Sequence, residues 1–228
     1  MPHSDEYDHI ADAIFAARRL VLEYKRKNNG LISPIQITAM QTPSGWGENK
    51  KIIGMLDVAM ALTRVEIEVV EFSPLPEENP VDAFISSVSS GKKVVFVADH
   101  NNFCWRRFYS CKELCHAVMN DRESLRTSGA EACRRLISDL KSPPLPAGEL
   151  YPAYEAECAA YLGAIEMLLP PEFFTGIKES KGVFSAYEIA LKYRVPRFVV
   201  EQIITGSLLI KLIERIREQP QYRNLQFN

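Results

Sequence analysis

The chain has 228 residues, of which 46% are hydrophobic and 25% charged, as in an ordinary globular protein. Its formal net charge of −2 excludes a general electrostatic attraction to nucleic acid or to anionic membranes. No apolar run reaches the roughly 20 residues of a membrane span, and no signal peptide is evident, so we expect a cytoplasmic protein. The five cysteines lack the spacing of a disulfide scaffold, so we expect them to be free thiols.

Apolar residues three or four apart predict helices along most of the chain, at residues 6–28, 51–63, 81–89, 105–119, 121–140, 151–169, 185–193, 196–204 and from Gly206 to about 217. Alternating or β-branched residues predict strands at 64–72 and 93–98. Proline and glycine predict a partial loop at 31–47, a loop at 74–80 and a linker at 142–148. Together these elements predict an α+β fold.

The linker divides the chain into an N-terminal region, residues 1–141, with the strands and the helix at 105–119, and a helical region, residues 149–228. A chain of this length supports one core of roughly 150–200 residues and a small appendage, so we expect one compact unit. The last predicted helix carries an apolar stripe that packs either on this core or in a dimer, and the oligomeric state stays open.

The helix at 105–119 contains a near match to the zinc-peptidase motif H-E-x-x-H. In that motif two histidines four residues apart bind zinc from one helix face, and the glutamate acts as general base. Here Lys112 stands at the first ligand position, followed by Glu113 and, at the second ligand position, His116. The ammonium group of a lysine repels a divalent cation at ligand distance, so this motif both indicates zinc chemistry and argues against it.

Two segments resemble the ImmA/IrrE-like zinc peptidases, also called the DUF955 group. Residues 107–116 resemble the pattern R-F-T-x-A-H-E-L-G-H, and residues 157–170 resemble E-x-x-A-x-x-F-A-x-x-L-L-M-P, with Gly163 in place of the aromatic residue. With the helix pair at 185–204, the resemblance spans about residues 50–205. It implies a zincin-like helical core, a small sheet and a helical C-terminal extension, with Glu157 as the third zinc ligand.

Each residue at this site has a second interpretation. Glu113 is a general base or an ordinary helix glutamate, His116 is a ligand or a core histidine, and Glu155 is an alternative carboxylate to Glu157. Lys112 either pairs with Glu157 or Glu113, its ammonium replacing the charge of the metal, or is a functional lysine with a shifted pKa.

Substitute zinc ligands are also available near the motif. Cys111 and Cys115 share a helix face, rotated by about 100° from that of Lys112 and His116. With His100 or His116 they form a donor set that zinc accepts, although small buried cysteines on a core face explain the same spacing.

The helix pair at 185–204 follows the spacing of a helix-turn-helix. Its second helix offers Arg197 and Gln202 to a nucleic acid but places Glu201 between them, which makes a poor surface for phosphate. We therefore expect this pair to pack against the core.

These patterns predict a degenerate metallopeptidase fold that is catalytically impaired and holds no cofactor. Such a protein acts by binding a protein partner, and the resemblance suggests a repressor-type regulator in phage, mobile-element or stress regulation. The first alternative is an active zinc endopeptidase that uses Glu113, His116, Glu157 and a substitute ligand. The second is a helix-turn-helix DNA-binding regulator.

Overall fold

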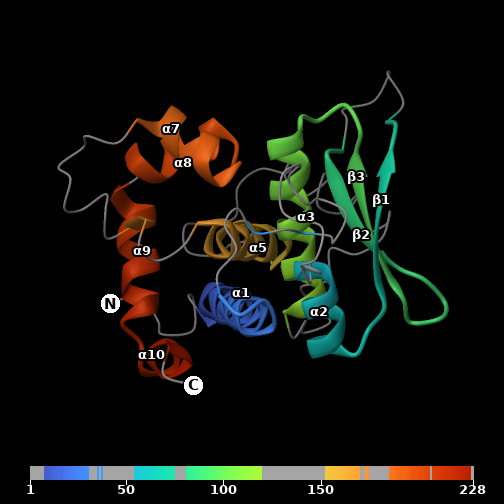
Figure 1. Cartoon of the computed structure of the whole chain (residues 1–228), viewed down its shortest axis with the longest axis horizontal. Helices are drawn as coiled ribbons and strands as arrows, with labels where there is room; N and C mark the ends of the chain where they lie inside the picture. The colour runs from blue at the N-terminus through green and yellow to red at the C-terminus, as the bar shows by residue number, and fades with distance from the viewer. Residues whose placement is uncertain are drawn as a thin grey trace.

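Figure 1 shows the computed structural model of the chain, which describes residues 8–30, 35, 37, 54–74, 81–119, 152–169, 173–174, 185–205 and 207–226. The helix predicted at 121–140 and the linker at 142–148 lie outside these residues. The elements in chain order are α1 (Asp8–Lys27), α2 (Met55–Thr63), β1 (Ile67–Phe72), β2 (Ala83–Ser87), β3 (Lys93–Ala98), α3 (Phe103–Val118), α5 (Pro152–Leu168), α7 (Ala186–Tyr193), α8 (Arg197–Thr205), α9 (Ser207–Arg217) and α10 (Pro220–Gln226).

The described residues form an α+β structure that is mostly helical and has one small sheet. The strand order is β1-β3-β2, with β1 parallel and β2 antiparallel to β3. The sheet lies at one side of the molecule, α3 packs against β2 and β3, and α5 and α1 lie beyond α3 (Figure 1). None of the described helices combines the length and the apolar character that crossing a membrane requires.

The helix predicted at 81–89 is wrong, because this segment contains strand β2. Its side chains alternate across the sheet: Ile85 is buried on the helix-covered face, and Phe84 stacks on Phe96 of β3 at a centroid distance of 4.7 Å on the other face. Gly91, with φ of +80°, completes the tight turn that joins β2 to β3. Pairing with β3 therefore decides the conformation of a short segment whose periodicity alone is ambiguous.

Helices α1, α3 and α5 approach one another closely at Gly163 of α5. A Cβ atom on Gly163 would lie 2.5 Å from Cys115 Sγ of α3 and 3.3 Å from the carbonyl oxygen of Ala13 of α1. The space that a side chain would fill is therefore already occupied by the neighbouring helices. This contact accounts for a glycine at position 163.

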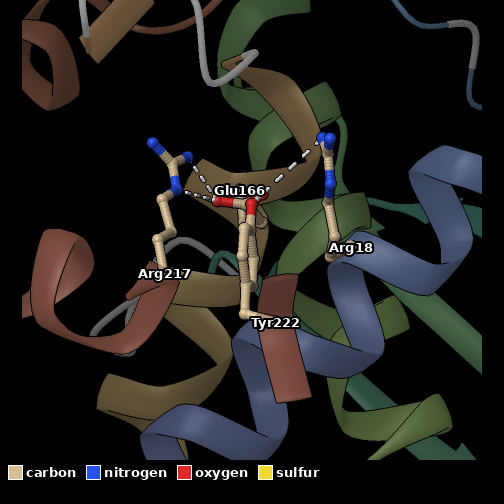
Figure 2. A network of polar contacts seen from close by, with 4 residues as sticks. All are labelled: Arg18, Glu166, Arg217 and Tyr222. Atoms are coloured by element: carbon tan, nitrogen blue, oxygen red, sulfur yellow. Dashed lines mark hydrogen bonds and ion pairs between the residues drawn. The ribbon is translucent and has the colours of Figure 1, made fainter. Parts of the chain in front are cut away.

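A buried carboxylate, Glu166 of α5, joins four helices (Figure 2). Tyr222 of α10 donates its hydroxyl to Glu166 Oε1 at 2.6 Å, and Arg217 of α9 donates through Nε and Nη2 to Oε2 at 3.2 and 2.5 Å. Arg18 Nη1 of α1 lies 4.0 Å from Oε1. This network fastens the C-terminal helices to α1 and α5.

The amphipathic helix predicted after Gly206 corresponds to α9, whereas α10 was not predicted. Ile213 and Ile216 of α9 are each 1% exposed within the single chain. Of the two predicted uses of the apolar stripe, these residues therefore show packing on the core.

Replacing Gly163 with alanine should destabilise the protein by about 1–3 kcal/mol, because the added methyl group forces α3 and α5 apart. This loss would occur although alanine favours a helix interior over glycine by about 1 kcal/mol. Urea unfolding of Gly163→Ala, Cys115→Ala and the double variant measures the coupling. The double variant should lose less than the sum of the single losses, and strict additivity would show that no contact exists.

Replacing Tyr222 with phenylalanine removes the hydroxyl that binds a buried carboxylate. We expect a loss of about 1.5–3 kcal/mol, the range for hydrogen bonds to charged groups. The matched control is Tyr187→Phe, because Tyr187 is 60% exposed and its change should stay within about 0.5 kcal/mol. Equal stabilities of the two variants in urea unfolding would contradict the role of the Tyr222 hydroxyl.

Candidate functional site

Helix α3 positions the candidate residues and is fixed at both ends. The side chain of Asn102 accepts hydrogen bonds from the backbone nitrogens of Cys104 at 3.0 Å and Trp105 at 3.1 Å, which begins the helix. At the other end, Lys93 Nζ donates to the carbonyl oxygen of Ala117 at 2.9 Å. A regular helix between these ends places residues four apart on one face.

The structure brings together the four residues of the predicted site. Lys112 Nζ contacts Glu157 Oε2 of α5 and lies 3.3 Å from Glu113 Oε1. His116 Nε2 lies 3.3 Å from the other oxygen of Glu157, Oε1. The predicted pairing of Lys112 with Glu157 and Glu113 is therefore confirmed, and the ammonium group occupies the place between the two carboxylates.

The charges of this group stabilise one another. Burial by itself would lower the pKa of Lys112, but Glu113 and Glu157 outweigh it and raise that pKa above its usual value. Burial would likewise raise the pKa of Glu157, but His116 and Lys112 lower it to about 2. Lys112 is therefore a firmly charged cation, whereas a nucleophilic lysine requires a lowered pKa.

Two buried polar atoms, one on α3 and one on α5, have no aligned hydrogen-bond partner among the described residues. They are His116 Nε2 and the hydroxyl of Tyr161, which lies one helical turn after Glu157 on α5. The contact of 3.3 Å between His116 and Glu157 is thus an ion-pair distance without the direction of a good hydrogen bond. The site is polar and tightly enclosed, since the side chains of Lys112 and Glu157 are 16% and 24% exposed.

His100 does not join this group. Its Nε2 atom lies 3.5 Å from Asp82 Oδ1, and its side chain is 42% exposed. Asp82 also accepts hydrogen bonds from Asn101 Nδ2 and from the hydroxyl of Tyr109, each at 2.9 Å. His100 therefore belongs to a separate cluster that ties the start of β2 to the turn before α3.

The two cysteines of the motif helix lie in the core. Cys111 and Cys115 are free and fully buried, and burial raises the pKa of Cys111 to about 12 and that of Cys115 well above its usual value. Zinc binds the thiolate form of cysteine, so this environment opposes ligation. Glu155 belongs to α5, but its side chain lies outside the described residues.

The position of the Lys112 ammonium group opposes the binding of zinc at this site. Within the described parts of the chain, no three histidine, cysteine, aspartate or glutamate side chains converge as metal ligands would. The ammonium group of Lys112 also lies between the carboxylates that a divalent cation would need.

Arg107 holds distant segments of the chain against α3, and only part of this role can be predicted from the sequence. The residue is 2% exposed. Its Nη1 atom donates to the carbonyl oxygens of Tyr193 at 2.9 Å and Arg194 at 2.6 Å. Its Nη2 atom donates to the carbonyl oxygen of Ile35 at 2.5 Å. Its partners are carbonyl groups of distant segments. The turn between α7 and α8 is therefore held against α3, and the predicted packing of the helix pair on the core is confirmed.

In comparisons with known proteins, no family model matches the chain, and no curated protein matches it significantly.

Replacing Glu157 with glutamine should change how stability depends on pH. The pKa of Glu157 is lowered from 4.5 to about 2, so its carboxylate stabilises the fold above about pH 4.5 and loses this effect as the pH falls toward 2. The contribution is at most on the order of 3 kcal/mol. Urea unfolding between pH 6 and about pH 3 should show a smaller loss for Glu157→Gln than for the unchanged protein. The control Glu188→Gln, at an exposed position, should follow the unchanged protein.

Proposed function

We propose that this chain is a degenerate zincin-like protein of the ImmA/IrrE type that is catalytically impaired and acts by binding a protein partner. One observation carries the proposal: the ammonium group of Lys112 lies between Glu113 and Glu157, where the resemblance implies a zinc ion. The resemblance itself rests on the residues of α3 and α5 described above.

The chemistry of this arrangement disfavours peptide hydrolysis. A metal ion in a peptidase polarises the substrate carbonyl and lowers the pKa of a bound water molecule. An ammonium group has no vacant coordination position for water, so Lys112 replaces the charge of a metal but not its reactivity. Glu113, the general base of the complete motif, is engaged by the same ammonium group at 3.3 Å.

If the site does not hydrolyse peptides, the function that remains for the protein is to bind a protein partner. The resemblance suggests a repressor-type regulator as the partner, in the control of phage, mobile-element or stress genes. The DNA-binding alternative is less favoured, because Arg197 of α8 already donates to Glu201 at 2.6 Å. That interaction leaves the second helix of the pair with little unpaired charge for phosphate.

Metal analysis of protein purified without chelator tests this proposal. The unchanged protein should contain no stoichiometric zinc, whereas Lys112→His should bind about one zinc ion per chain, because it restores a second imidazole four residues before His116. This zinc should disappear when His116→Ala is added. Lys192→His, at an exposed position of α7, is the matched control and should bind none.

Two outcomes would oppose the proposal in different ways. Stoichiometric zinc in the unchanged protein that is lost on His116→Ala would contradict the loss of the metal and would favour the active endopeptidase alternative. Failure of Lys112→His to bind zinc, in a variant that folds by circular dichroism, would reject the descent of the site from a zinc centre.

A further inference from the structure

We propose that a cleft between α1 and the ends of α2 and α3 binds a short peptide with free termini, about three residues long. These elements meet in the lower half of Figure 1, and the cleft between them has a volume of about 630 Å³. Sites for small molecules have volumes of about 300–1,000 Å³. The residues that line the cleft do not belong to the group around Lys112, so this inference goes beyond the proposed function and does not depend on it.

One face of α1 supplies both signs of charge to the cleft. Asp12 and Arg19 line it, and both residues are exposed. Neither has a hydrogen bond or an ion pair with another described residue. They are seven residues apart, so they lie on the same face of the helix, separated by about 10 Å along its axis. Each charge is therefore available to a ligand group of the opposite sign.

Apolar side chains line the same cleft. Two of them lie between the charged residues on α1, and the others come from the segments around the ends of α2 and α3. Leu62, near the end of α2, is 43% exposed and therefore presents a large apolar surface to a ligand. The apolar residues of the lining include Phe15, Ala16, Leu62, Val65, Val118 and Met119.

These groups together define the chemistry of the ligand. Asp12 complements an ammonium group, and the guanidinium group of Arg19 complements a carboxylate, which arginine binds through two parallel hydrogen bonds. A ligand that reaches both residues carries its two charges about 10 Å apart, with an apolar group between them. An extended peptide of three residues spans about 10 Å and carries these charges at its two ends. Its middle side chain then lies at the apolar residues of the cleft.

The walls of the cleft are fixed by hydrogen bonds within the protein. Lys93 Nζ donates to the carbonyl oxygen of Ala117 at 2.9 Å, which ties β3 to the end of α3 and engages the third charged residue of the lining. Thr63 Oγ1 donates to the carbonyl oxygen of Ala59 at 2.8 Å and accepts from the backbone nitrogen of Val65 at 3.3 Å. A binding surface that is fixed in advance lowers the entropic cost of association.

Titration of the full chain with the tripeptide Ala-Leu-Ala, followed by NMR, tests the proposal. The dissociation constant should lie below about 1 mM. Two blocked peptides, N-acetyl-Ala-Leu-Ala and Ala-Leu-Ala-amide, each lose one terminal charge and should bind at least about 10-fold more weakly. The dipeptide Ala-Leu should also bind at least about 10-fold more weakly, because it is too short to reach both charged residues.

Charge variants assign each end of the peptide to a residue. Asp12→Asn and Arg19→Gln should each weaken the binding of Ala-Leu-Ala by about 10-fold. Asp12→Asn should leave the binding of the acetylated peptide unchanged, and Arg19→Gln should leave that of the amide unchanged, because the lost contact is then already absent. Lys25→Gln, at an exposed position of α1 outside the cleft, is the matched control and should bind like the unchanged protein.

A third variant tests the apolar part of the cleft. Leu62→Ser should weaken the binding of Ala-Leu-Ala by about 5-fold or more, because the leucine of the peptide loses apolar contact. The matched control is Val88→Ser, since Val88 is 41% exposed outside the cleft and its change should leave binding unaltered. Circular dichroism verifies that all variants fold.

Each contrary result has a definite meaning. Absence of binding, equal binding of the free and blocked peptides, or cleft variants that bind as tightly as the unchanged protein would overturn the proposal. If the acetylated peptide binds as tightly as the free one and only the amide fails, the cleft is a site for carboxylates alone, and the peptide proposal is rejected. Zinc content has no part in these measurements, so a failure here leaves the proposed function untouched, and a failure of that function leaves the cleft untouched.

Discussion

The close approach of α3 and α5 at Gly163 determines which residues of the two helices can interact. Because Gly163 has no side chain, Cys115 Sγ packs against the backbone of α5. Glu157 lies less than two turns earlier on α5, so the same spacing lets it reach Lys112 and His116. The apolar packing of α1, α3 and α5 therefore sets the geometry of the polar site as well as the stability of the core.

Two carboxylates, of Glu113 and Glu157, and the ammonium group of Lys112 lie in the interface between α3 and α5. Burying them costs solvation free energy, which their mutual attraction offsets only while both signs of charge are present. A neutral residue in place of Lys112 would leave Glu113 and Glu157 without a cation between them. A cation between these two carboxylates is thus a structural requirement where α3 meets α5.

The sequence predicts those parts of the structure that depend on spacing within one element. Lys112, Glu113 and His116 share α3, so their proximity follows from helical geometry. Strand β2 was not predictable, because pairing with β3 decides it. Glu157 lies on another helix and was expected only through the resemblance. The Glu166 network joins four helices, and its one local signal is a glutamate within the apolar run at 164–169.

Arg107 has a consequence for how the molecule unfolds. If the turn between α7 and α8 opened, the carbonyl groups of Tyr193 and Arg194 would lose their donor, and a buried guanidinium group would remain unsatisfied. Opening this turn therefore carries the cost of leaving part of that group unsatisfied, about 1–3 kcal/mol or more because it is charged. These hydrogen bonds couple the helix pair to the helix that carries Lys112. A pulling force applied to α7 or α8 would be transmitted directly to α3.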